Sequence, residues 1–163
     1  SRGLCETCAM SNTTSVSVSV DINAPADEVW SMVTDLPRMG EWSPENQGGE
    51  WAKGATGAAV GAVFKGTNKN GKKQWSTSVK VNACDAPRKF SFGLMLLGKN
   101  WCDWIYEIEP TSTGCRVTHS WVDHRTPLAG TLGKWASGVA DRATHNKANM
   151  EVTLANLKKA AEQ

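Results

Sequence analysis

The sequence predicts an α+β domain in which a curved antiparallel sheet grips a long C-terminal helix. Three observations support this fold class. Residues 14–22 alternate strictly between apolar and polar side chains, which is the pattern of a strand with one buried face. Further strand-like segments follow at close spacing and are joined by short turns. Residues 128–162 instead carry apolar side chains at helical spacing.

The first predicted strand spans residues 14–22. Val16, Val18, Val20 and Ile22 fall on one face, and the intervening Ser and Asp side chains fall on the other. Successive side chains of a strand point to opposite faces of a sheet, so the apolar set is expected to face the core and the polar set to face solvent.

Two short helices are predicted after this strand. Pro25 is compatible with a first helical turn, and Asp27 and Glu28 follow it, where the positive end of the helix dipole favours acidic groups. Pro37 breaks the pattern, and a second short helix is expected to run through Met39.

The middle of the chain is predicted to form an antiparallel meander. Asn70-Gly71 is typical of a two-residue hairpin turn and lies between two strand-like segments. Closely spaced strands with short turns pair with their sequence neighbours. The predicted strands after the first are residues 49–52, 60–68, 72–83, 89–96, 101–109 and 114–123.

The last segment, residues 128–162, is predicted to be one long helix. Its apolar side chains recur at helical spacing and include Leu132, Trp135, Ala136, Val139, Ala143, Met150, Leu154 and Leu157. Gly130, Gly133 and Gly138 weaken its first half, so we expect fraying or a kink there.

The length and composition indicate one domain, expected over residues 13–163, after a disordered N-terminal extension at residues 1–12. The net charge of +2 is too balanced for nucleic-acid binding. No apolar run reaches the roughly 20 residues of a membrane-spanning helix. The chain shows no secretory signal and has five irregularly spaced cysteines, so we expect it to be cytoplasmic.

Tryptophan is unusually frequent, with eight Trp against three Phe and one Tyr. A core built only for packing has little reason to prefer Trp over Phe. A pocket wall that must be apolar and still offer N–H donors has more reason to do so. The composition therefore favours an apolar pocket with a few hydrogen-bonding groups.

Several motifs in order resemble the polyketide cyclase/dehydrase branch of the SRPBCC, or START-like, superfamily. They are Ile22-Asn23-Ala24-Pro25, Glu41-Trp42-Ser43-Pro44, Pro87-Arg88-Lys89-Phe90, Trp104-Ile105-Tyr106-Glu107-Ile108 and Cys115-Arg116-Val117-Thr118, with residues 61–68 and 150–154. The resemblance implies a helix-grip fold of about seven strands around the last helix. It also implies a cavity that holds lipids, sterols, polyketides or similar molecules. Fold alone does not fix the reaction.

Strand alternation predicts which aromatic residues face this cavity. The candidate wall residues on the strands are Trp75, Thr77, Phe90, Phe92, Trp104, Tyr106 and Trp121. Trp135, Val139 and Met150 are expected to cover the cavity from the long helix, and small residues beside them leave room. The resemblance places Trp42 near the cavity mouth. Alternatively, these aromatic side chains simply pack against the helix.

His119 is the candidate catalytic residue, because an inward imidazole, whose ordinary pKa lies near neutral pH, can act as a general acid or base. The alternative is a buried histidine that satisfies one hydrogen bond. The three histidines do not have the spacing of a metal site, and we expect no metal and no cofactor. Cys5-x-x-Cys8 does not lie between a strand and a helix and lacks the second pair of a zinc set.

The leading hypothesis is therefore a carrier or binding protein, monomeric or homodimeric, whose partner is a small hydrophobic molecule. One alternative is a cyclase or dehydratase that acts on such a molecule. The resemblance adds a third, a co-chaperone-like interaction module, which would need a contiguous exposed apolar patch.

Overall fold

A computed structural model describes residues 14–163 of the chain. The predicted extension at residues 1–12 and the Cys5–Cys8 pair lie outside the described residues. In chain order the elements are β1 (Ser15–Ile22), α1 (Ala26–Val33), the 3₁₀ helix η1 (Leu36–Glu41), β2 (Asn46–Ala52), β3 (Val63–Asn70), β4 (Lys73–Asp85), β5 (Lys89–Leu96), β6 (Lys99–Pro110), β7 (Cys115–Asp123), α2 (Pro127–Ser137) and α3 (Arg142–Ala161).

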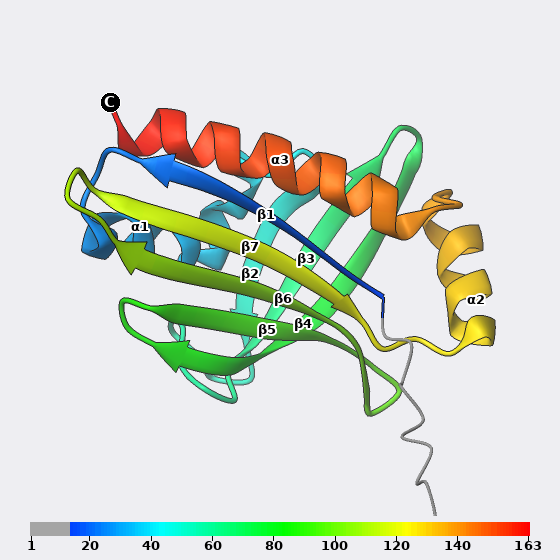
Figure 1. The fold of residues 1–163 in the computed structure, drawn as a ribbon. Helices are drawn as coiled ribbons and strands as arrows, with labels where there is room; N and C mark the ends of the chain where they lie inside the picture. The colour runs from blue at the N-terminus through cyan, green and yellow to red at the C-terminus, as the bar shows by residue number, and fades with distance from the viewer. Residues whose placement is uncertain (1–13) are drawn as a thin grey trace, which may run out of the picture.

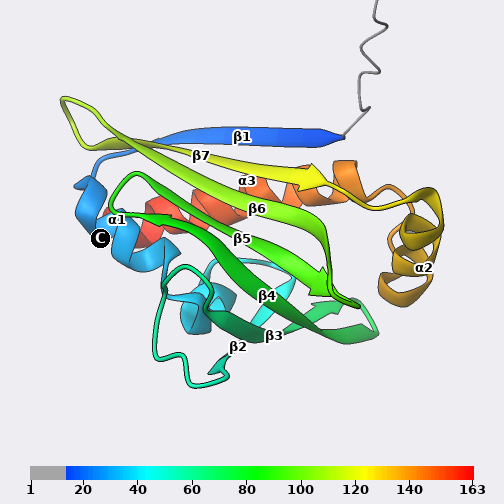
Figure 2. The same ribbon diagram turned by 90° about the horizontal axis from the view of Figure 1, so that it is seen from below.

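The strands form a seven-stranded sheet in the order β1-β7-β6-β5-β4-β3-β2. Every neighbouring pair is antiparallel. From β2 to β7 the chain meanders, and β1 closes the sheet by pairing with β7. Figure 1 shows α3 running along the sheet, and Figure 2 shows the same helix behind the strands. The predicted helix-grip fold is thus confirmed, with α1 and η1 as the short helices after the first strand.

The alternation of β1 produces the two faces expected of it. Ile22 is buried and the serines are exposed. On the outer face, the hydroxyl groups of Ser17 and Ser120 lie 2.8 Å apart, and those of Ser19 and Thr118 lie 2.9 Å apart. These cross-strand hydrogen bonds between β1 and β7 use the polar set that the sequence places toward solvent.

The β3–β4 hairpin lies one residue further along the chain than predicted. Asn70 pairs with Lys73, so the two turn residues are Gly71 and Lys72 rather than Asn70 and Gly71. Gly71 has φ 60°, a left-handed conformation that glycine adopts at low cost and that this hairpin turn requires.

The predicted single helix over residues 128–162 is wrong in one respect, because the structure divides it into α2 and α3. Gly138 has φ 72° and follows the last residue of α2. Asp141 then caps α3, since its carboxylate accepts a hydrogen bond from the Thr144 backbone N–H at 3.1 Å. A left-handed glycine ends a helix and an Asp N-cap begins one, so these two residues enforce a break where only a kink was expected.

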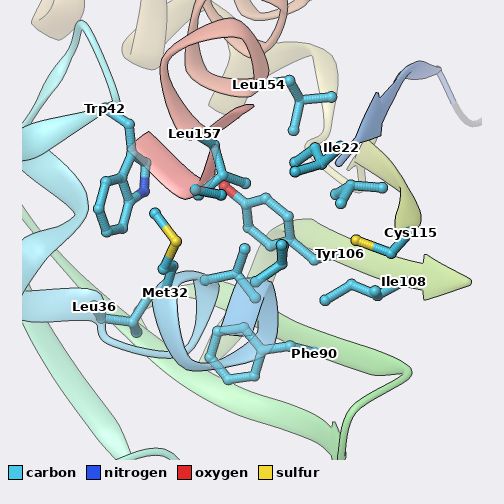
Figure 3. Close-up of a cluster of buried hydrophobic side chains, with 14 of the residues drawn as sticks. Ile22, Met32, Leu36, Trp42, Phe90, Tyr106, Ile108, Cys115, Leu154 and Leu157 are labelled. Atoms are coloured by element: carbon cyan, nitrogen blue, oxygen red, sulfur yellow. The ribbon is translucent and has the colours of Figure 1, made fainter. Parts of the chain in front are cut away.

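The main apolar core lies beneath α1 and the last turns of α3. Figure 3 shows Leu154 and Leu157 of α3 among the buried side chains of this core, together with Ile22 and Tyr106. Figures 1 and 2 place α1 and α2 at opposite ends of the sheet, with the C-terminus near α1. The solid core thus occupies the α1 end, and the first half of α3 lies nearer the α2 end.

Candidate functional site

A cavity of about 980 Å³ lies between the sheet and the first half of α3. Its lining comes from η1, all strands from β2 to β7, α2 and α3. Pockets that hold small molecules have volumes up to about 1,000 Å³, so this one is large enough for a ligand of several rings. Leu96 and Ala136 are exposed and belong to the lining, so the cavity opens to solvent beside α2.

The space exists because of the side chains that the first half of α3 presents to the sheet. The α3 residues that line the cavity are Arg142, Asn146, Asn149 and Met150 in its first half and Thr153 just beyond it. Most of these are polar, and they do not interdigitate with the strands as large apolar side chains would. A row of Leu or Phe at the same helical spacing would fill the cavity.

One wall of the cavity is a run of stacked aromatic rings on β6 and β7. Tyr106 and His119 are direct cross-strand partners, and their ring centroids lie 3.9 Å apart with planes 9° from parallel. Trp104 also stacks with His119, at a centroid distance of 5.7 Å. Trp104 is also the cross-strand partner of Trp121, at a centroid distance of 6.3 Å. Aromatic pairs of this kind stabilise a sheet and present a flat apolar surface.

His119 is only 4% exposed and lies within this wall. Its Nδ1 is 3.0 Å from the Ile105 carbonyl oxygen. A carbonyl can only accept a hydrogen bond, so Nδ1 carries the proton and Nε2 of the neutral ring keeps an acceptor lone pair. Burial lowers the pKa of His119 to about 4, and the smaller effect of the Ile105 hydrogen bond opposes that shift. The imidazole is therefore neutral at neutral pH.

Tyr106 and Cys102 contribute two further polar groups to the lining. Burial raises the pKa of the Tyr106 phenol above its usual value of 10, so the hydroxyl stays protonated and can donate. Burial likewise raises the pKa of the Cys102 thiol to about 11. This thiol is not ionised at neutral pH and does not act as a nucleophile.

The opposite side of the cavity is polar and centres on Glu45, which precedes β2. The Glu45 carboxylate accepts hydrogen bonds from Arg142 Nη1 at 3.0 Å and from His145 Nε2 at 2.7 Å. The side chains of Glu45 and Arg142 are only 18% and 15% exposed. Asn149 Nδ2 lies 3.4 Å from the same carboxylate. The cluster ties the loop before β2 to the start of α3.

Eight of the predicted site residues line the cavity, and they come from β4, β5, β6, β7 and α3: Trp75, Thr77, Phe92, Trp104, Tyr106, His119, Trp121 and Met150. They belong to the strands and the helix face for which alternation and helical spacing made a definite prediction. Sequence patterning thus places these side chains together around one space.

Four predicted residues lie outside the lining. Trp42 and Phe90 are 3% and 0% exposed and belong to the apolar core; Phe90 packs edge-on against Trp30 at 6.1 Å. Val139 is buried in the link between α2 and α3. Trp135 was expected to cover the cavity but is 80% exposed on α2, because the break after α2 takes its helix out of line with α3.

The sequence reasoning missed Glu45, Arg142, Asn146 and Asn149. The three helix residues share one face at spacings of four and seven, so a polar stripe at core positions was a signal in the sequence. No such signal existed for Glu45, which lies 97 residues from Arg142 along the chain.

Within residues 14–163, no group of three or more His, Cys, Asp or Glu side chains is arranged to hold a metal ion. The helices in the same part of the chain are too short or too polar to cross a membrane.

The comparisons with known proteins agree with this geometry. A family model described as "Polyketide cyclase / dehydrase and lipid transport" matches residues 13–162. No curated protein matches the sequence. Among solved structures, the Polyketide_cyc-like protein Cgl2372 from Corynebacterium glutamicum is 25% identical, with a TM-score of 0.59 over 94% of this chain and 92% of that one.

Two more distant structures share the fold. The di-domain ARO/CYC StfQ from the steffimycin biosynthetic pathway gives a TM-score of 0.71 at 15% identity, over 92% of this chain and 51% of that chain. The Aha1 dimer from Colwellia psychrerythraea gives 0.65 at 14% identity, over 91% of this chain and 96% of that one. At identities of 15% and 14%, the likeness to these two proteins shows the fold alone.

Proposed function

This chain belongs to the polyketide cyclase / dehydrase and lipid transport family, and from that premise we propose that it binds a small hydrophobic molecule in the cavity between the sheet and α3. The observation that carries the proposal is the cavity itself, at about 980 Å³. The stacked wall of Trp104, His119 and Tyr106 offers apolar surface to flat rings. Displacing water from such a surface favours binding.

Binding is a better match to the cavity than catalysis. A general base works best with a pKa near the operating pH, and burial holds the pKa of His119 at about 4. Tyr106 stays protonated and is a very weak acid. Glu45 is a carboxylate, but Arg142, His145 and Asn149 donate hydrogen bonds to it. These groups are arranged to hold a ligand in place rather than to transfer protons.

The tryptophans supply the test. Trp104 lines the cavity, whereas Trp135 is 80% exposed on α2. We expect titration with flavonoids, steroids, fatty acids and aromatic polyketides to include at least one compound that changes Trp emission saturably and raises the Tm. With that compound, Trp104→Phe should lose much of the emission change, and the matched Trp135→Phe should keep it.

If no compound changes emission or Tm at high micromolar concentration, the cavity is not a binding site for this class of molecule. The same holds if Trp135→Phe removes the signal and Trp104→Phe preserves it, because the ligand would then sit on α2.

A second candidate function is a cyclase or dehydratase, favoured by one observation. The neutral His119 has an acceptor at Nε2, and its ring lies 3.9 Å from that of Tyr106, which bears a donor. A paired acceptor and donor on one wall is the minimum needed to move a proton within a bound molecule. In that case His119→Gln should abolish turnover of a bound polyketide-like substrate while its dissociation constant stays within a few-fold of wild type.

A further inference from the structure

Asn146 presents an unmet hydrogen-bond donor at the cavity wall. The residue is 2% exposed and belongs to the cavity lining. Its Oδ1 accepts from Arg142 Nη1 at 3.3 Å, which fixes the orientation of the amide. Its Nδ2 is buried and has no hydrogen-bond partner among residues 14–163. A buried donor without a partner destabilises a fold, so such a group marks a place where an acceptor is expected.

Arg142 adds further donors beside Asn146. Within the described part of the chain, the hydrogen bonds of its guanidinium all leave from Nη1, toward Glu45 and Asn146. The group lies over the Trp75 ring, with Cζ 5.9 Å from the ring centroid. A guanidinium has five N–H donors in a fixed plane, so its other nitrogens can donate toward the cavity that Arg142 lines.

The charges around Asn146 and Arg142 decide which kind of acceptor these donors can bind. The Arg142 cation is matched by the Glu45 carboxylate at 3.0 Å, and both side chains are mostly buried. A ligand carboxylate placed here would add a second anion next to Glu45 in a partly desolvated site, which is unfavourable. A neutral carbonyl oxygen accepts hydrogen bonds from the same donors without adding charge.

We propose that the cavity selects an apolar molecule bearing a neutral carbonyl oxygen, which accepts hydrogen bonds from Asn146 and Arg142 while the ring body lies along the stacked aromatic wall. This proposal rests on the proposed binding function and goes beyond it by specifying the ligand's polar group and the residues that donate hydrogen bonds to that group. It also predicts that fatty acids and other carboxylates are poor ligands, although their chains are apolar.

The test uses three probes of matched size: 2-acetylnaphthalene, 2-ethylnaphthalene and 2-naphthoate. They place a ketone, an ethyl group or a carboxylate on the same ring system. Dissociation constants are measured by NMR titration of the whole chain. We expect the ketone to bind about tenfold more tightly than the ethyl compound, as for one buried hydrogen bond that gains a partner. The carboxylate should bind most weakly.

Two leucine variants on α3 assign the effect. Asn146→Leu removes the unsatisfied donor at similar volume, so most of the tenfold preference for the ketone should be lost, with Arg142 as the remaining donor, while the ethyl compound keeps its affinity. The free variant should melt no lower than wild type, because an unsatisfied donor has been removed. Asn156 donates to the Trp42 carbonyl at 3.0 Å and is not part of the lining. Asn156→Leu should therefore preserve the tenfold preference.

A direct readout covers the case in which Asn146→Leu fails to fold. In wild type, the side-chain amide protons of Asn146 should move downfield with the ketone and stay in place with the ethyl compound. Equal affinities for ketone and ethyl compound, or tightest binding of the carboxylate, would overturn this inference and leave the binding function standing. If none of the probes binds, the carbonyl site is excluded, and the titration with flavonoids, steroids, fatty acids and aromatic polyketides decides the binding function separately.

Discussion

The two halves of α3 belong to one continuous helix, but one packs into the core and the other lines the cavity. The second half places Leu154 and Leu157 in the main core, at 2% and 0% exposure. The first half places Arg142 and Asn146 against a cavity of about 980 Å³. Met150, also in the first half, is buried against Cys102 and Trp121 and still lines the cavity.

This difference shows how a small sheet can both grip a helix and keep a cavity. The apolar contacts at the α1 end hold α3 in place, so the α2 end does not need to be filled. Cavity walls cost packing energy, and the loss is tolerable when another part of the same element is packed to native density. Stability and ligand binding are thus assigned to different turns of one helix.

The largest expected effect comes from breaking the gripping half. Leu157→Ala should lower the free energy of unfolding by about 2–5 kcal/mol, because Leu157 is fully buried and its removal leaves a void. Val152→Ala is the matched control on the same helix, 46% exposed, and should change stability by no more than about 0.5 kcal/mol. Urea unfolding measures both. Similar losses for the two variants would show that the second half of α3 is not the packed half.

The cavity should instead show its effect through pH, at His119 on β7. Burial lowers the pKa of His119 from 6.5 to about 4 in the folded protein. Between those values the unfolded chain binds a proton that the folded protein does not. The stability that the folded protein owes to its neutral His119 is therefore fully present above pH 6.5 and is lost as the pH falls toward 4. From pH 7 to pH 5 this residue should remove about 2 kcal/mol of stability.

Urea unfolding of wild type and His119→Gln at pH 7 and pH 5 isolates the loss of stability caused by His119, since the two proteins share all other titrating groups. Wild type should lose about 2 kcal/mol more than the variant. An equal loss in both proteins would mean that His119 is not held neutral by burial.

A smaller effect is expected at the boundary where the cavity half begins. Asp141 accepts hydrogen bonds from the backbone N–H and the hydroxyl of Thr144, at 3.1 and 2.8 Å. These bonds lower the pKa of Asp141. Asp141→Ala should speed amide hydrogen exchange in the first turn of α3 and lower the Tm less than Leu157→Ala does. Unchanged exchange at Thr144 would show that the cap does not hold this end of the helix.

The smallest effect is expected on α2. Trp135 is 80% exposed, with the Lys73 ammonium 5.9 Å from its ring centroid as a surface contact. Trp135→Ala should change the free energy of unfolding by about 0.5 kcal/mol or less in urea unfolding. A loss comparable to that of Leu157→Ala would show that this side chain is packed in the interior rather than exposed on α2.

The sequence was informative wherever one period governed a whole element. Alternation along β6 and β7 correctly placed Trp104, Tyr106, His119 and Trp121 on one face, because a strand has only two faces to choose from. It could not say how far along that face the packed core ends. Phe90 and Phe92 share a face of β5, yet only Phe92 reaches the cavity.

The misses have physical causes. Trp135 was misplaced because helical spacing was extended across Gly138, whose left-handed backbone ends α2. The polar cluster around Glu45 was missed because Glu45 and Arg142 meet only through tertiary structure. Polar residues at core spacing on α3 were the available sign that this half of the helix faces something other than a packed core.

The methyl groups of two residues on α3 test the central claim most directly. The Met150 methyl lies in the half that lines the cavity, and the Leu157 methyls lie in the packed half. In ¹H–¹³C spectra, saturating 2-acetylnaphthalene should move the Met150 resonance through the ring current of the ligand and leave the Leu157 resonances in place. Movement of Leu157 with Met150 unchanged, or binding that moves neither, would contradict the assignment of the cavity to the first half of α3.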